Sequence, residues 1–416
     1  MMDVADEYGF TDWFTDRRDG YLASLMELVR IPSTSPDEHR AGDWAADYFA
    51  ARGFTVRRED RHPDTLRHPL ANPNRFPQLP GSLRQNVHVD CGGSGSPSDR
   101  VLFSAHLDVV PATPRFTDAF VPRLDGAHLV GRGTADTKGN LVMVAAALDF
   151  LDGRGIRRRP VELDLVVEEE IGGNGALSSC LWGRAATAVV VLEPTDLVVY
   201  TGHRGVVLGT IELLGPSAHI GGSDGRLVDA IGPLVAMLVD EERELTAVAR
   251  AHASFADCAN PIQVNVSAIA GGQWFGSRPE SVRLDVTVGV LPWETPAAAA
   301  ERLSTALRKR LGATFPRIGT RLDFSGMRNG GYLGDQREVA LARTLVPDPV
   351  GDPVPAAGRT WNVSCDARLY RSVLGLPTVV FGAGSLTEAH GIDEKLDLAQ
   401  WERGIRLLAN FLRSTK

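Results

Sequence analysis

Hydrophobic residues are concentrated in several short runs along the chain, and helix-like segments separate these runs. The aliphatic runs cover residues 101–110, 161–167, 186–192 and 376–384, and a helical apolar segment at 141–155 lies between the first two. Unbroken Val and Leu runs that alternate with helices are typical of parallel strands buried on both faces. The pattern therefore predicts an α/β fold with a mainly parallel sheet covered by helices.

Near residue 203 the pattern changes, because apolar and polar residues begin to alternate. Strand-like alternation at 202–220, 260–272 and 280–292 is interrupted by helical patterns at 225–252 and 295–313. Alternation with a period of two indicates half-exposed strands, and this mixed order is typical of a small α+β, ferredoxin-like unit. We predict that a second domain, residues 203–325, is inserted into a first domain made of residues 1–202 and 326–416.

The remaining segments are predicted from residues that end helices or favour loops. Two helices are expected within residues 16–54, the first ending near Pro32 and the second near Gly53. Residues 60–99 are rich in Pro, Gly, Ser and Asn and are predicted to be mainly loop with short strands, and 345–358 is predicted to be a proline-rich surface loop.

The segment "LDLVVEEEIGGNGA" (163–176) combines a buried-looking strand with three consecutive acids, Glu168, Glu169 and Glu170. Adjacent carboxylates repel one another, and a buried carboxylate without a partner is costly. Two interpretations are open at this point: the strand ends in solvent, or a positively charged group lies among the three acids.

Histidine and carboxylate residues also follow the other predicted strands. In an open α/β sheet, ligands bind at the carboxyl ends of the strands, so these residues are expected to share one edge. Such donors suit Zn²⁺, with Co²⁺ or Mn²⁺ as further possibilities. The candidates are His106, Asp108, Asp136, Glu169, Glu170, Glu193 and His390.

These donors are too many for one four-coordinate zinc, which favours two metal ions that share a carboxylate. Asp136, a short side chain on a glycine-framed loop, is the expected bridge. Asp108 is expected to accept the second N–H of the His106 ring and so fix its orientation. Of Glu169 and Glu170, one would bind metal and the other would take a proton from metal-activated water.

Composition and charge narrow the classes of partner. The chain has 43% apolar and 23% charged residues and a formal net charge of −8. An acidic protein lacks the basic surface that nucleic acids and anionic membranes require, so neither is an expected partner. Four widely spaced cysteines, no signal-like start and no long apolar run favour a soluble cytoplasmic protein.

The motifs "SAHLDVVP", "GRGTADTKG", "EEEIGGNGA", "LEPTD", "GPSAHIGG" and "AHGIDE" resemble those of the M20 metallopeptidase family, the group of acetylornithine deacetylase, succinyl-diaminopimelate desuccinylase and carboxypeptidase G2. The resemblance covers nearly the whole chain. It implies a dinuclear zinc or cobalt hydrolase in which the inserted domain is a lid that also forms a homodimer. One ion would be held by His106, Asp136 and Glu193, and the other by Asp136, Glu170 and His390.

The resemblance also implies catalytic roles. Glu169 would be the general base and Asp108 the residue that orients His106. His219, in the lid, would cross the dimer interface to stabilise the oxyanion.

Two positions depart from the family pattern. The first acid of the family's Asp-Glu-Glu run is Glu168 here, and Gly289 occupies a lid position where many members carry an arginine that binds a substrate carboxylate. Arg278 and Arg368 are candidate replacements, because a guanidinium pairs with a carboxylate through two parallel hydrogen bonds. Asn265 is a candidate substrate contact, although an exposed polar strand residue explains it equally well.

Several functions are compatible with such a site. The leading hypothesis is an acetylornithine-deacetylase-like deacylase that hydrolyses an N-acyl amino acid or a related small amide. The alternative is a metallo-carboxypeptidase or dipeptidase of the same family, acting on a short peptide. Phosphoester hydrolysis would call for a basic cluster that the motifs do not supply. A non-catalytic dimeric binding protein is disfavoured because Glu169 and every candidate ligand are present.

Overall fold

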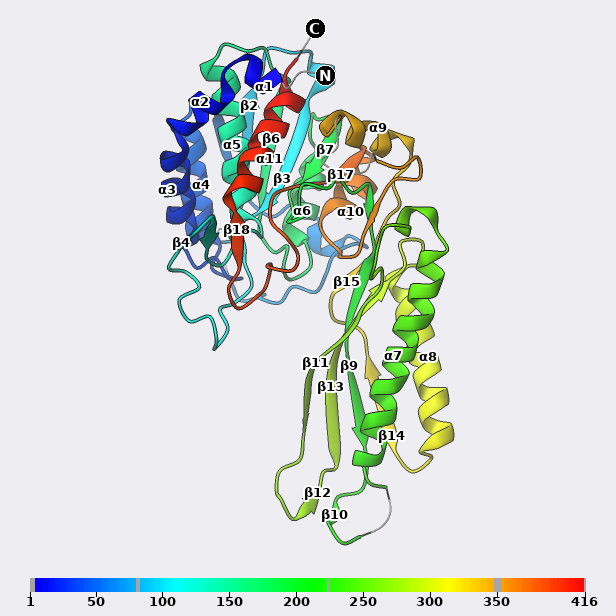
Figure 1. Cartoon of the computed structure of the whole chain (residues 1–416). Coiled ribbons are helices and arrows are strands. Elements are labelled where there is room, and N and C mark those ends of the chain that lie inside the picture. Colours follow the sequence, from blue (N-terminus) through cyan, green and yellow to red (C-terminus); the bar gives the residue numbers. More distant parts are fainter. Residues whose placement is uncertain (1–3, 80–82, 223–224, 348–353, 415–416) are drawn as a thin grey trace. The chain divides into compact units, whose positions relative to one another are not determined.

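The structure, a computed structural model, describes residues 4–79, 83–222, 225–347 and 354–414 (Figure 1). It forms two compact units. The larger unit extends to Thr201 and includes Gly334–Gly358 and the chain from Cys365 onward, and the smaller unit comprises Gly202–Leu333 and Arg359–Ser364. The segment 359–364 joins the smaller unit because β16 (Thr360–Trp361) pairs with β8 (Gly202–His203).

A six-stranded sheet lies at the centre of the larger unit, in the order β1-β2-β6-β3-β7-β17. Five strands point the same way and β2 runs antiparallel to both of its neighbours, so the predicted mainly parallel sheet is confirmed. The strands are β1 (Thr55–Glu59), β2 (Asn86–Gly92), β3 (Val101–His106), β6 (Val161–Val166), β7 (Ala188–Val191) and β17 (Thr378–Val380).

The strands β1 and β2 lie in or beside a region that the sequence analysis predicts as mainly loop. β2 is buried between β1 and β6 although it carries His88 and Asp90. The His88 ring lies 2.8 Å from the buried Asp164 carboxylate of β6. A polar residue in this strand is therefore satisfied by a hydrogen bond inside the protein, which a hydropathy pattern does not show.

Helices pack on both sides of this sheet (Figure 1). The apolar α5 is almost fully buried between β3, α3 and α11, and the Trp401 indole of α11 donates a hydrogen bond of 2.9 Å to the Gly139 carbonyl of α5. The helices are α1 (Val4–Glu7), α2 (Phe10–Thr15), α3 (Arg18–Val29), α4 (His39–Ala50), α5 (Lys138–Gly153), α6 (Asn174–Trp182), α9 (Gln336–Leu345), α10 (Ala367–Leu369) and α11 (Leu398–Leu412).

The larger unit also contains a second, smaller sheet. A small sheet joins β4 (Arg123–Asp125), β5 (His128–Val130) and β18 (Lys395–Asp397). Part of the predicted proline-rich loop, residues 348–353, lies outside the described residues.

Among the helices of the described segments, none combines the length and apolar character needed to cross a bilayer.

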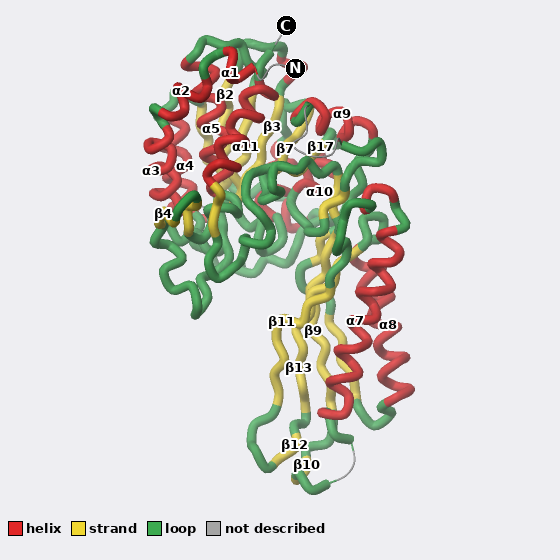
Figure 2. The backbone as a smooth tube through the Cα atoms, in the orientation of Figure 1, coloured by secondary structure: helices red, strands yellow, loops and turns green. Residues whose placement is uncertain are grey.

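The smaller unit is an antiparallel sheet with two helices on one face (Figure 2). Its inward-facing valines and leucines on β9 and β13 pack against α7 and α8 as one apolar core. The sheet order is β11-β13-β9-β14, with β15 (Arg328–Asn329) also paired to β9. The elements are β9 (Gly205–Leu214), α7 (Val228–Arg250), β11 (Val264–Gly271), β13 (Ser281–Val290), α8 (Pro296–Thr314) and β14 (Gly319–Asp323).

Candidate metal centre

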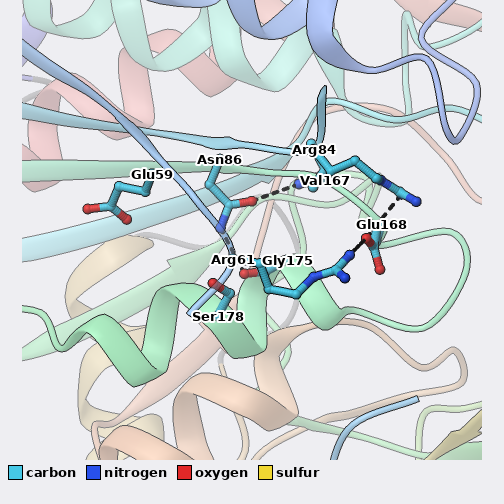
Figure 3. A pocket seen from close by; sticks show the side chains of 8 residues that line it. All are labelled: Glu59, Arg61, Arg84, Asn86, Val167, Glu168, Gly175 and Ser178. Atoms are coloured by element: carbon cyan, nitrogen blue, oxygen red, sulfur yellow. Dashed lines mark hydrogen bonds and ion pairs between the residues drawn. The ribbon is translucent and has the colours of Figure 1, made fainter. Parts of the chain in front are cut away.

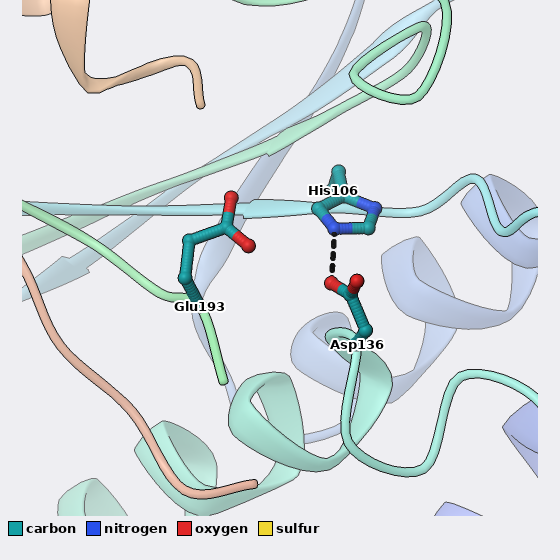
Figure 4. A group of neighbouring side chains, drawn as sticks. All are labelled: His106, Asp136 and Glu193. Atoms are coloured by element: carbon teal, nitrogen blue, oxygen red, sulfur yellow. Dashed lines mark hydrogen bonds and ion pairs between the residues drawn. The ribbon is translucent and has the colours of Figure 1, made fainter. Parts of the chain in front are cut away.

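Three acidic or imidazole side chains meet at the carboxyl edge of the parallel strands. His106 is the last residue of β3, Glu193 follows β7, and Asp136 lies on the loop that precedes α5. All three are buried, and Figure 4 shows their polar ends turned toward one another. One donor atom from each lies within 4.8 Å of the others.

A second group shares Asp136 with the first. It adds Glu170, which follows β6, and His390, which follows β17 and is half exposed. The Asp136 Oδ1 atom lies 2.9 Å from His106 Nε2, while Oδ2 lies 3.2 Å from His390 Nε2. The two oxygens of one carboxylate therefore serve the two groups, which contain the same residues as the two ligand sets implied by the family resemblance.

The spacing within the second group fits a tetrahedral metal ion. Donors bound to one zinc at about 2.0–2.1 Å lie roughly 3.3 Å apart. His390 Nε2 lies 3.1 Å from Glu170 Oε1 and 3.2 Å from Asp136 Oδ2. Both distances from His390 Nε2 are therefore close to those between ligands of a single ion, and the donor atoms of the group all lie within 4.8 Å of one another.

The hydrogen bonds of His106 identify which nitrogen is available to a cation. Its Nδ1 lies 2.8 Å from the backbone carbonyl oxygen of Asp108, which can only accept, so Nδ1 carries the hydrogen. In the neutral ring, Nε2 is then an acceptor that faces the Asp136 carboxylate, another acceptor. This contact requires a positive charge, either a proton on the ring or a metal ion between the two groups.

Neighbouring carboxylates raise the pKa of both histidines and so favour a positive charge on each ring. Burial opposes the charged ring of His106, but the Asp136 carboxylate outweighs burial and holds the pKa of His106 well above its ordinary value. Burial is likewise outweighed at His390, where Glu170 and Asp136 raise the pKa to about 11. The cluster of acids thus draws protons onto both rings, and divalent cations supply that positive charge equally well.

Burial and neighbouring acids also raise the pKa values of two carboxylates at this centre. Burial, with Asp136 as the main neighbouring charge, raises the pKa of Glu193 well above its ordinary value. Burial and the Asp366 and Glu193 carboxylates do the same for Glu169. Divalent ions bound among these acids would offset both the burial and the mutual repulsion, because a nearby positive charge favours the ionised carboxylate. The residues present therefore fit a two-ion site.

The three consecutive acids lie in a turn beyond the end of β6. Glu168 adopts a left-handed backbone conformation, with φ of 67°, and its carbonyl accepts a hydrogen bond of 2.7 Å from the Gly173 N–H. Gly173 also has positive φ, and a Cβ there would lie 2.1 Å from the Asp366 carboxylate, so only glycine fits. The turn lets Glu169 and Glu170 leave the strand's alternation.

The position of Asp108 differs in detail from the expectation. Its carboxylate was expected to accept from the His106 ring, but its Oδ1 lies 3.8 Å from Nδ1, and the backbone carbonyl of the same residue takes that bond. The carboxylate instead accepts the backbone N–H groups of Glu169, at 3.2 Å, and Glu170, at 3.0 Å. Asp108 therefore orients His106 with its main chain and the glutamate turn with its side chain.

Glu394 is a contributor that the sequence analysis does not identify. One of its oxygens accepts three backbone N–H bonds, from Gly133 and Ala135 at 3.0 Å and from Asp136 at 3.1 Å. Its other oxygen pairs with the buried Arg132 at 2.7 Å. Glu394 lies in the quoted motif "AHGIDE", but its target is 258 residues away along the chain.

The predicted substrate-binding residues lie in both units. Arg368, on α10, is buried in the larger unit, donates a 3.0 Å hydrogen bond to the Gly172 carbonyl, and interacts electrostatically with Asp366 and Glu169. Asn265 is exposed on β11 of the smaller unit. His219 is exposed on β10 (Ala218–His219), which pairs with β12 (Ser277–Arg278), and the Arg278 Nε donates to the His219 carbonyl at 3.3 Å.

The space beside Gly289 is filled by another arginine. A Cβ on Gly289 would lie 3.2 Å from Arg204 Cδ and 3.1 Å from Ile262 Cγ2. The Arg204 guanidinium is buried and bonds to the Gln263 side-chain oxygen at 2.6 and 2.9 Å. An arginine at position 289 would therefore compete with Arg204 for the same space, and glycine relieves this conflict.

This geometry defines a candidate centre for divalent cations on an α/β sheet, and comparison with known proteins gives the family. Peptidase family M20/M25/M40 matches residues 102–414, so the chain belongs to that family. The chain is a metal-dependent hydrolytic enzyme of the M20 peptidases.

Similar proteins include enzymes with different named activities. The chain is 28% identical over 399 residues to a probable carboxypeptidase of Aspergillus terreus, covering 93% of this chain and 84% of that protein. It is 24% identical over 427 residues to the N-formyl-4-amino-5-aminomethyl-2-methylpyrimidine deformylase of Bacillus subtilis, covering 94% and 93%.

Solved structures share the fold. Human carnosine dipeptidase 1 has a TM-score of 0.72 at 16% identity, covering 96% of this chain and 97% of that chain. YXEP of Bacillus subtilis, described as a dinuclear metal binding peptidase of the M20 family, has a TM-score of 0.57 at 14% identity, covering 95% and 98%.

Proposed function

We propose that this chain is a dinuclear metal-dependent amidohydrolase that releases the acyl group of an N-acyl amino acid or a related small amide, as acetylornithine-deacetylase-like deacylases do. The observation that carries the proposal is the position of Asp136, whose two oxygens face His106 at 2.9 Å and His390 at 3.2 Å. A single carboxylate shared by two histidine-containing groups is the arrangement that a two-ion hydrolase needs. Zinc suits the donors best, and cobalt and manganese are alternatives.

Bound in these groups, divalent ions would polarise the amide carbonyl and make water a better nucleophile at neutral pH. Glu169 acts beside them as general base: it belongs to neither ligand group, and its backbone N–H is fixed by Asp108. It takes a proton from the attacking water and returns that proton to the leaving nitrogen. Burial and Asp366 raise the pKa of Glu169, which makes its carboxylate a stronger base for the first transfer.

The proposal includes a homodimer formed through the smaller unit, which acts as a lid. His219 is exposed in that unit, and there it donates to the oxyanion in the active site of the partner subunit. One well-placed donor of this kind contributes about 2.7–4 kcal/mol to transition-state stabilisation. Arg278 is bonded to the His219 backbone, so it accompanies His219 and is a candidate for binding a substrate carboxylate.

A peptidase is the second candidate, favoured by relatives and structural neighbours named carboxypeptidase and dipeptidase. Both reactions cleave an amide bond, and they differ in how the substrate is held. Arg368 and Asn265 are the remaining candidate substrate contacts, and Gly289 removes the arginine expected in the lid. The four cysteines are free thiols, which fits the reducing cytoplasm where we propose that the enzyme works.

The test is amine release from N-acetyl, N-formyl and N-succinyl amino acids and from simple dipeptides. The protein is stripped with a chelator and assayed with and without added Zn²⁺ or Co²⁺. We expect metal-restored hydrolysis of at least one acyl amino acid. Hydrolysis confined to dipeptides would favour the peptidase, and inactivity on every substrate, with no metal bound, would contradict the proposal.

A further inference from the structure

A buried cluster of charges lies behind the glutamate turn and belongs to neither ligand group. Arg84 Nη2 lies 3.0 Å from Glu38 Oε1 and 3.1 Å from Glu168 Oε1, and the Arg61 guanidinium also pairs with Glu168. The Glu38, Arg84 and Glu168 side chains are at most 3% exposed, and Arg61 is 20% exposed at the rim. We call these four residues the Glu168 clamp, and Figure 3 shows three of them.

The clamp fixes the first of three adjacent acids. Glu168 is held by two guanidinium groups that come from the N-terminal part of the chain, Arg61 after β1 and Arg84 before β2. A carboxylate without such partners would be drawn to the same cations as Glu169 and Glu170. Pairing with Arg61 and Arg84 keeps the Glu168 carboxylate away from those cations. It also stabilises the left-handed backbone of Glu168, a conformation that non-glycine residues adopt only when their surroundings require it.

The opposite side of the turn is held through the motif "IPSTSPDE" (31–38). The Ser35 hydroxyl donates to Glu38 of the clamp and lies 3.5 Å from Asp108 Oδ2. The Asp108 carboxylate in turn accepts the backbone N–H groups of Glu169 and Glu170. The clamp therefore holds Glu168 through its side chain, and Asp108 holds Glu169 and Glu170 through their backbone N–H groups.

Asn86 on β2 secures both ends of the turn. Its side-chain oxygen accepts the Val167 N–H at 3.2 Å, and its side-chain nitrogen donates to the Gly175 carbonyl at 2.8 Å, as Figure 3 shows. The segment between these contacts carries Glu169 and Glu170. Their position thus depends on residues that touch neither the proposed ions nor the substrate.

We propose that Glu168 is a positioning residue, which Arg61 and Arg84 hold so that Glu169 and Glu170 point correctly at the metal centre. The proposal rests on the proposed function and extends it to residues outside the ligand groups. Its consequence is specific: loosening the clamp lowers the affinity for the ion bound by Asp136, Glu170 and His390, and it lowers kcat through Glu169. A cluster that served only stability would alter neither property in the folded protein.

The test is a Co²⁺ titration of the metal-free protein, followed by visible absorption, which needs no substrate. The variants are Glu168→Gln, Glu168→Asp and Arg61→Gln. The matched control is Arg52→Gln, because Arg52 is 19% exposed and pairs with Asp149 at 3.1 Å, away from the turn. Loss of residues that orient metal ligands typically lowers affinity about 10–100-fold, and we expect this range in Glu168→Gln for the ion held by Asp136, Glu170 and His390.

The other variants separate positioning from stability. We expect Arg61→Gln to weaken the same ion about 10-fold, Glu168→Asp to recover part of the affinity, and Arg52→Gln to match the parent. With the best substrate, kcat should fall in Glu168→Gln while KM stays within about twofold, because the groups affected act in the transition state.

Folded Glu168→Gln and Arg61→Gln proteins that bind both ions as the parent does would overturn the proposal. If Glu168→Gln does not fold, Arg61→Gln decides the matter, because Arg61 lies at the rim of the cluster. A parent that binds fewer than two ions contradicts the proposed function itself, and the positioning role falls with it.

Discussion

Replacing Glu394 by glutamine tests how the loop that carries Asp136 is held. The Glu394 carboxylate accepts the N–H groups of Gly133, Ala135 and Asp136 at 3.0–3.1 Å and pairs with Arg132 at 2.7 Å. Glutamine has nearly the same shape but no charge, and its amide nitrogen cannot accept. The substitution therefore removes the charge from these bonds and leaves Arg132 without its counter-ion.

The magnitude follows from burial. The side chains of Arg132 and Glu394 are 1% and 0% exposed, so solvent cannot compensate the charge left behind. Removing one partner of a buried pair costs about 3–5 kcal/mol, and that range is our prediction for the loss in unfolding free energy.

Urea unfolding of the metal-free protein measures this loss. Glu388→Gln is the control, because Glu388 lies on the same loop and pairs with Lys395 at 3.4 Å, with both side chains about a third exposed. An exposed pair contributes about 0–1 kcal/mol, so the control should scarcely differ from the parent. A loss below about 1 kcal/mol in Glu394→Gln would refute the reasoning.

Three further predictions concern catalysis and stability. Glu169→Gln should retain its metal ions, measured by elemental analysis, and lose about 10²–10⁴-fold in kcat, because only the base is removed. His219→Ala should lose about 10²–10³-fold in kcat, and mixing it with Glu169→Gln subunits should restore part of the activity in mixed dimers. Asp164→Asn should lower the unfolding free energy by about 3–5 kcal/mol, because the carboxylate pairs with the buried Arg184. Burial opposes the charge of Asp164, but Arg184 and His88 outweigh it and hold its pKa below the usual value, so this difference should persist at neutral pH and shrink below about pH 4.

Each of these predictions has a contrary result. Full activity of Glu169→Gln would assign the base elsewhere. Mixed dimers without recovered activity would mean that His219 acts within its own chain or not at all. A stability difference in Asp164→Asn that grows as the pH falls would reverse the sign argued for this carboxylate.

The two candidate ligand groups could be predicted from the sequence because their histidines and carboxylates follow recognisable strands. His106 and Glu193 end or follow unbroken aliphatic runs, and parallel strands bring their carboxyl ends to one edge. The contacts that hold these residues could not be predicted in the same way. Glu394 accepts the Asp136 backbone N–H but lies 258 residues further along the chain. This contact therefore depends on how two loops meet.

Polar residues account for most of what the sequence analysis missed. The pattern predicts only short, unplaced strands around β2, because His88 interrupts its hydrophobic residues, and in the folded protein the His88 ring contacts the buried Asp164 carboxylate at 2.8 Å. The position of Arg204 beside Gly289 depends on two strands packing side by side. Such pairings become visible only when the chain is folded.

The most direct test of the central claim is the number of metal ions that the protein binds, with Asp136→Asn as the comparison. If Asp136 is shared by two ions, calorimetric titration of metal-free parent protein with Zn²⁺ should give two ions per chain. Asp136→Asn should then weaken both sites together. A parent that binds one ion, or a variant that still binds two with unchanged affinity, would contradict the account.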